Sequence, residues 1–87
     1  MHIETLWNNI KQYEGETFYT TTGKPYKYVV YNDYIMVENV KGSRITKDNL
    51  AKAITIKNPT PSKIALAGCW GPSYICGIIT DKRVKDL

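Results

Sequence analysis

The sequence predicts a mixed α+β fold, in which an N-terminal helix packs on a three-stranded antiparallel meander and two C-terminal helices follow. Three observations lead to this prediction. Apolar residues recur at helical spacing near the N-terminus, β-branched and aromatic residues fill the middle between turn signals, and helix-capping residues appear in the second half. A chain of 87 residues can build one hydrophobic core, so we expect a single domain over residues 1–87.

The N-terminal helix is predicted by apolar residues that recur at the i, i+3, i+4, i+7 spacing of one helix face. These residues are Ile3, Leu6, Trp7, Ile10 and Tyr13. Polar residues occupy the opposite side. Gly15 follows at the position where a left-handed residue commonly ends a helix.

Three strands are predicted next, because three segments are rich in β-branched and aromatic residues. The segments are 18–22, 26–31 and 34–39. A turn at 22–25 separates the first two strands. Asn32 and Asp33 tolerate the positive φ of a tight turn, so the second and third strands are expected to form a hairpin.

The hairpin turn predicts a specific register. It places Lys27 opposite Glu38 as a pair of opposite charges. The other predicted pairs are Tyr31 with Tyr34, Val30 with Ile35, Val29 with Met36 and Tyr28 with Val37. The face that carries Tyr28 is expected to meet the N-terminal helix, and the face that carries Tyr31 and Tyr34 is expected to be partly solvated.

The second half of the chain predicts helices. Residues 41–44 are interpreted as a basic loop, and Thr46 as the N-cap of a helix that runs to about Ile54. Residues 62–67 fit either a helical turn that Ser62 caps or a short strand. Apolar residues at helical spacing predict a helix over 73–81, although their β-branched content also permits a buried strand. Pro72 suits the first turn of that helix, and its cap is Gly71 or Ser73.

The charge is distributed unevenly along the chain. Residues 1–40 hold three lysines and five carboxylates, whereas residues 41–87 hold nine lysines and arginines and three carboxylates. The net charge is therefore −2 in the first part and +6 in the second. Such an asymmetry is typical of nucleic-acid-binding proteins, and it also occurs on unrelated lysine-rich surfaces.

The residue content argues against several function classes. The one histidine is His2, and the two cysteines, Cys69 and Cys76, have no second pair, so neither a metal site nor a histidine-assisted nucleophile is expected. We predict no enzymatic activity and no cofactor. No apolar run approaches the roughly 20 residues of a membrane span. We therefore expect a cytoplasmic protein with no membrane partner and with buried free thiols.

Anion binding is the best supported chemistry. Gly71 and Ser73 would begin a helix whose free backbone N–H groups attract a phosphate, although such a turn is more often only a helix start. The basic residues predicted to contact phosphates are Lys41, Arg44, Lys47, Lys82 and Arg83. We expect them to gather on one continuous patch beside the hairpin.

The hairpin tyrosines are the remaining candidate contacts. Tyr31 and Tyr34 could stack on bases, anchor a protein interface, or only stabilise the hairpin as a cross-strand pair.

The stretches 18–26 and 71–75 resemble a pattern in small bacterial and phage proteins, and the Lys-, Asn-, Ile- and Tyr-rich composition is similar to that of low-GC Gram-positive bacteria and their phages. The resemblance implies a small regulator or inhibitor, a class that includes phage anti-defence proteins. The leading hypothesis is a nucleic-acid-binding or nucleic-acid-associated accessory domain. The alternatives are an inhibitor or adaptor that binds a protein partner, such as a host CRISPR or nuclease complex, through the tyrosine-rich sheet face, and a binder of a small phosphorylated ligand.

Overall fold

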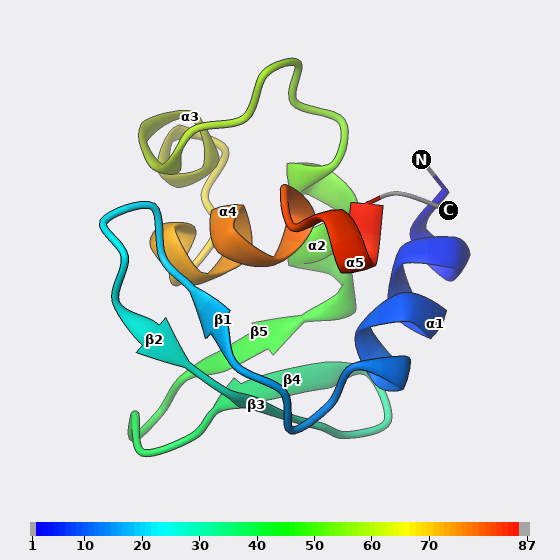
Figure 1. Cartoon of the computed structure of the whole chain (residues 1–87). Coiled ribbons are helices and arrows are strands. Elements are labelled where there is room, and N and C mark those ends of the chain that lie inside the picture. The colour runs from blue at the N-terminus through cyan, green and yellow to red at the C-terminus, as the bar shows by residue number, and fades with distance from the viewer. Residues whose placement is uncertain (1, 86–87) are drawn as a thin grey trace.

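A computed structural model describes residues 2–85 of the protein, and it contains the predicted mixture of helices and antiparallel strands (Figure 1). The helices are α1 (Ile3–Gln12), α2 (Lys47–Ala53), α3 (Pro61–Leu66), α4 (Pro72–Ile79) and α5 (Lys82–Lys85). The strands are β1 (Phe18–Tyr19), β2 (Pro25–Tyr26), β3 (Tyr28–Val30), β4 (Tyr34–Val37) and β5 (Arg44–Thr46). Across residues 2–85, no helix is long and apolar enough to cross a bilayer.

The predicted hairpin is confirmed in its register. Tyr28 pairs with Val37 and Val30 with Ile35 across the antiparallel β3 and β4. The amide of Tyr31 donates to the carbonyl of Tyr34 at 2.8 Å, which closes the turn. The inner face is buried as expected, because turn chemistry and side-chain alternation specify the same pairing.

The three-stranded sheet is not built from the three segments that the sequence predicted. The strand order of the three-stranded sheet is β3-β4-β5, so its third member is Arg44–Thr46, which the sequence analysis interpreted as loop and helix start. The predicted first strand, 18–22, is shortened to Phe18–Tyr19 and pairs with β2 in a separate two-stranded ladder. It stops at Thr20 because the hydroxyl of this residue accepts from the amide of Lys24 and so completes the turn.

Helix α1 covers the inner face of the sheet. Leu6 and Ile10 are fully buried, and the hydroxyl of Tyr28 donates to the carbonyl of Ile10 at 2.6 Å. His2 is the N-cap, and its Nδ1 accepts from the amide of Glu4. The predicted packing of the N-terminal helix on the sheet is thus confirmed.

Helix α2 begins directly after Thr46, as this capping residue predicted, and it follows the unpredicted strand β5 without a break. The hydroxyl of Thr46 accepts from the amide of Asn49 at 3.1 Å, and Ile45 and Leu50 on either side of the cap are fully buried. The chain therefore passes at this cap directly from the last strand of the sheet into a helix.

The two ambiguous segments are both helical. The cap of α3 is Thr60 and not Ser62, because Pro61 occupies the first helical position. The cap of α4 is Gly71, which adopts a left-handed φ of 65°. The short helix α5 was not predicted, since four residues are too few to show a period.

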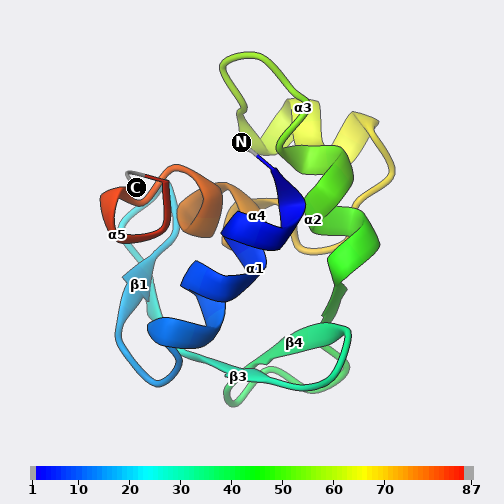
Figure 2. The ribbon, with the colours of Figure 1, turned by 90° about the vertical axis from the view of Figure 1, so that its right-hand side faces the viewer.

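The elements form two layers around one hydrophobic cluster. Helix α4 is the central helix, and five of its eight residues are buried. Figures 1 and 2 show the sheet β3-β4-β5 on one side of the molecule and the helices stacked on its inner face. The outer face of the sheet has no element over it within the described chain.

Candidate functional site

The outer face of the sheet carries a row of three stacked side chains. The rings of Tyr31 and Tyr34 are 4.9 Å apart and nearly parallel, at 16°. The guanidinium carbon of Arg44 lies 4.3 Å from the centre of the Tyr34 ring. Because β4 is the central strand, Tyr34 stands between its two neighbours. Both ring faces of Tyr34 are thus occupied, and Tyr31, which is 46% exposed, keeps a ring face open to solvent.

Three adjoining hollows run from this row along one side of the molecule. The first, of about 410 Å³, lies on the outer sheet face and is lined by Tyr31, Met36 and Lys41, among others. The second, of about 540 Å³, includes Lys24 and Lys27 in its lining. The first two hollows share lining residues 38–40. They therefore adjoin beneath the turn that follows β4.

The third hollow, of about 280 Å³, lies at the start of α4 and is lined by Gly71, Ser73 and two threonines. It shares Lys24 and Tyr74 with the second hollow. We call the three hollows together the basic groove. The structure thus brings Gly71 and Ser73, at one end of the groove, into line with Tyr31 at the other.

The basic groove is positively charged. Its lining contains Lys24, Lys27 and Lys41 and a single carboxylate, Glu38. Among residues 2–85, no carboxylate lies within ion-pair distance of these lysines or of Arg44. The amide of Glu38 donates to the carbonyl of Lys27 at 2.9 Å, but the predicted side-chain ion pair does not form. Exposed, unpaired ammonium groups of this kind are available to an anion.

Two of the predicted phosphate contacts lie elsewhere and are neutralised. Lys47 pairs with Glu4 at 2.9 Å, and its ammonium holds the pKa of that exposed carboxyl below its usual range. Arg83 pairs with Asp81 at 2.9 Å and with Glu16 at 3.3 Å. The Lys47–Glu4 and Arg83–Glu16 pairs join segments far apart in sequence, so these cations have structural partners.

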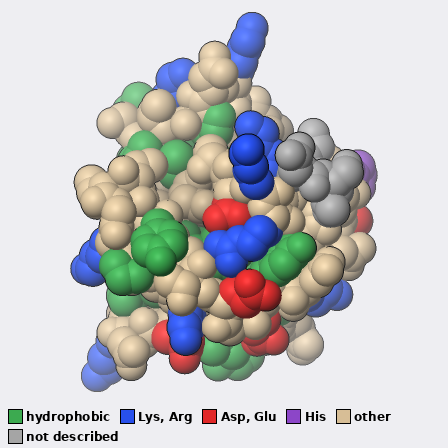
Figure 3. Space-filling model, viewed as in Figure 1, with side chains coloured by type: hydrophobic (Ala, Val, Ile, Leu, Met, Phe, Trp, Pro, Cys, Tyr) green, Lys and Arg blue, Asp and Glu red, His purple; other side chains and the backbone are tan. Residues whose placement is uncertain are grey.

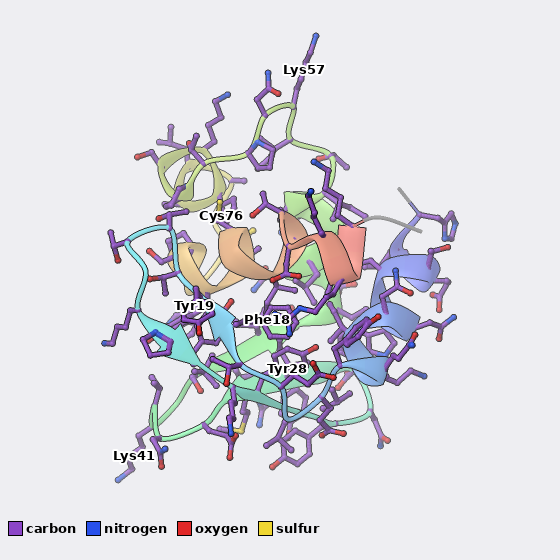
Figure 4. The ribbon with its side chains drawn as sticks, in the orientation of Figure 1. Phe18, Tyr19, Tyr28, Lys41, Lys57 and Cys76 are labelled. Carbon is purple, nitrogen blue, oxygen red and sulfur yellow. The ribbon has the colours of Figure 1, made fainter. Side chains whose placement is uncertain are left out.

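The single continuous patch that the sequence analysis expected is therefore not formed. Lys82 is exposed on α5 next to the paired Arg83, away from the lining of the groove. Figure 4 shows Lys41 and Lys57 at opposite ends of the molecule. At the centre of the face in Figure 3, basic and acidic side chains are in contact. Of the five predicted cations, Lys41 is the one that lines the groove, whereas Arg44 stacks on Tyr34.

Sequence reasoning missed Lys24 and Lys27. Both belong to the acidic first part of the chain, and β2 brings them beside residues 71–74 only in the folded state. A local signal existed for Lys27, because the hairpin register already placed it on the solvated face. The groove ends at the hairpin tip, where Glu14 and Asp33 line a separate hollow.

Within residues 2–85 no group of three His, Cys, Asp or Glu side chains is placed to hold a metal ion. Cys69 and Cys76 are buried free thiols, and burial raises the pKa of the Cys76 thiol. A scan against protein-family models finds no family that matches the chain, and no curated protein or solved structure matches it significantly.

Proposed function

We propose that the protein binds single-stranded nucleic acid along the basic groove, as an accessory domain without activity of its own. The observation that carries this proposal is the arrangement of three unpaired lysines, Lys24, Lys27 and Lys41, along adjoining hollows that end at an exposed aromatic ring, Tyr31. Proteins that bind single strands combine a basic groove for the backbone with an aromatic side chain for the bases.

The roles of the residues follow from their positions. Lys24, Lys27 and Lys41 line successive hollows and would contact phosphates in sequence along the strand. Tyr31 would stack on one base with its open ring face, while Tyr34 holds it in place from behind. A single strand is favoured over a duplex because only unpaired bases expose a face to such a ring.

Fluorescence anisotropy with a labelled oligonucleotide of about ten nucleotides tests the proposal. Binding should weaken from about 50 to about 200 mM salt, with a slope of roughly −0.7 per phosphate contact in a plot of log affinity against log salt. The triple variant K24A/K27A/K41A should lower the magnitude of that slope by about 2. Tyr31→Ala should cost about 1–3 kcal/mol of binding free energy.

The matched control is the triple variant K52A/K57A/K82A, which removes the same charge from exposed positions outside the groove. It should retain most of the binding. Equal losses in the two triple variants would mean that only net charge matters. Absence of binding by the wild type at low salt would refute the proposed function.

The second candidate is a protein partner on the outer sheet face, through which the chain would act as an inhibitor or adaptor. The observation that favours it is the preformed stack of Tyr31, Tyr34 and Arg44, since tyrosine and arginine are enriched at the energetic centres of interfaces. Capture of a partner from nuclease-treated lysate by the wild type, and its loss with Tyr31→Ala, would favour this candidate.

A further inference from the structure

The end of the molecule built from α3 and its flanking loops exposes a run of apolar residues. Leu66 is 88% exposed, and Trp70 is 42% exposed. Ala65, Ala67 and Gly68 in the same segment are also exposed. Single exposed apolar side chains are ordinary, whereas a contiguous run of them marks an interaction surface. We call residues 65–68, together with Trp70, the α3 surface.

Several contacts fix α3 in its place. The hydroxyl of Thr60 accepts from the amide of Lys63 at 3.2 Å and caps α3. The ammonium of Lys63 donates to the carbonyls of Lys57 and Asn58, at 3.2 and 3.1 Å, and so ties the helix to the loop before it. Ile64 anchors α3 in the core. A surface that is already ordered loses little conformational entropy when a partner binds.

The segment that carries the α3 surface is basic. Residues 49–80 contain no Asp or Glu, and the lysines among them are Lys52, Lys57 and Lys63. All three are exposed, and Figure 4 shows Lys57 extending into solvent at this end. In the view of Figure 3, the part of the molecule over α3 shows basic and no acidic side chains. A partner for this end must therefore be acidic as well as apolar.

We propose that the α3 surface docks an acidic segment of another protein, whose apolar side chain packs on Leu66 while its carboxylates meet Lys57, the lysine whose carbonyl is bonded to α3. Nucleic acid fits less well, because a leucine offers no ring face and Trp70 already stacks on Tyr74 at 6.3 Å. An anionic bilayer fits less well, because the ammonium of Lys63 is engaged by two carbonyls and a stable membrane anchor needs more than two lysines and one inserted leucine.

Selection from a library of random peptides of about 12 residues against the folded full chain tests this docking surface without relying on the basic groove. The enriched peptides should carry Asp or Glu around a large apolar residue. Leu66→Asp should weaken binding of the enriched peptides about tenfold or more, because it places a carboxylate where the apolar anchor packs. Lys57→Glu should weaken it several-fold, and more so at low salt.

Two matched variants serve as controls. Tyr19→Asp removes another exposed apolar side chain, and Lys11→Glu reverses a lysine on α1; both should leave peptide binding unchanged. Leu66 lies outside the core, so an unchanged thermal midpoint of L66D will show that its fold is intact. Peptides without acidic residues, or peptides that bind L66D as well as the wild type, would overturn the proposal. Binding to vesicles with about 30% phosphatidylserine, without binding to peptides, would also overturn the proposal.

Discussion

Gly77 determines how closely the central helix approaches the small β-ladder. A Cβ atom at this position would lie 2.3 Å from the carbonyl oxygen of Tyr19 and 2.8 Å from the hydroxyl of Tyr26. The same Tyr26 hydroxyl donates to the carbonyl of Tyr74 at 2.7 Å. Burial raises the pKa of Tyr26 well above its usual range, so this phenol remains a donor. The absence of a side chain at Gly77 thus lets α4 pack directly on β1.

We predict that Gly77→Ala destabilises the protein. Helix propensity alone would make alanine more favourable by about 1 kcal/mol. The new methyl group must displace a backbone carbonyl, which typically costs about 1–3 kcal/mol and can exceed the gain from propensity. The thermal midpoint should fall by roughly 4–8 °C for each kcal/mol of net loss. A midpoint at or above that of the wild type would mean that α4 can move away from β1 at no cost.

The variant Gly15→Ala is an informative comparison. Gly15 has a φ of 87°, and no atom lies within 4 Å of the place that a methyl group would take there, so the cost of this variant reports the backbone conformation alone. Near-wild-type midpoints for both variants would contradict the packing argument at Gly77.

At the scale of elements, the parts of the fold that could be predicted from sequence were those with local signals. The β3–β4 hairpin was predicted in its register because Asn32 and Asp33 specify the turn and the side chains alternate on both sides of it. The cap of α2 was predicted for the same reason, and Gly71, the cap of α4, was one of the two residues that the sequence offered. Strand β5 was missed because it has three residues, one of them fully buried, and its pairing with β4 is a tertiary event.

In the candidate site, too, the residues with local signals could be predicted and the contacts between distant segments could not. Arg44 and Lys41 could be proposed from their loop, and Tyr31 from the hairpin register. The proximity of Lys24 to Ser73, however, depends on how β2 packs beside α4. The structural roles of Lys47 and Arg83 also could not be inferred, since Glu4 and Glu16 are 43 and 67 residues away in sequence.

Ser43 completes the pairing between β4 and β5 with its side chain. Its hydroxyl oxygen accepts from the amide of Val37 at 2.8 Å and donates to the carbonyl of the same residue at 2.9 Å. Ser43 is fully buried, so water cannot replace these bonds. The backbone groups of Val37 at the end of β4 therefore have partners, although residues 41–43 lie outside the sheet.

Ser43→Ala should therefore destabilise the protein by about 1–3 kcal/mol, because the amide of Val37 loses its partner in a buried position. Urea denaturation followed by circular dichroism would measure the change as a lower midpoint at an unaltered slope. Ser62→Ala is the matched control: this serine is exposed on α3, and its replacement should change the stability by less than about 0.5 kcal/mol. Equal stabilities of the two variants would exclude the proposed role of Ser43.

At the scale of the whole molecule, Arg83 joins the C-terminal helix to the segment after α1. Its guanidinium donates to both carboxylate oxygens of Asp81, at 3.0 and 2.9 Å, and to the carbonyl of Thr17 at 2.8 Å. It also lies 4.0 Å from the centre of the Phe18 ring. Asn9 adds a second link through its bond to the carbonyl of Val84 at 2.8 Å. Segments from the two ends of the chain are therefore held together by polar contacts over a common core.

This junction predicts how stability depends on pH. The hydrogen bonds from Arg83 hold the pKa of Asp81 below its usual range. A carboxyl whose pKa is lower in the folded than in the unfolded state stabilises the fold above its unfolded pKa, near 3.9, and this contribution is lost as pH falls toward the folded pKa. We therefore expect Asp81→Asn to lower the urea midpoint at pH 7 and to have a progressively smaller effect below about pH 4.

The experiment compares urea midpoints of the wild type and Asp81→Asn from neutral pH to about pH 2.5. Glu4→Gln is the control, because the pKa of Glu4 is also lowered, by Lys47, but in an exposed ion pair that salt screens and that contributes little to stability. The difference between wild type and D81N should persist at high salt, whereas any difference for E4Q should disappear. If the wild-type and D81N midpoints run parallel through the acid range, the Asp81–Arg83 pair does not contribute to the pH dependence of stability, and α5 is held by its other contacts, among them the bond from Arg83 to Thr17 and the buried Val84.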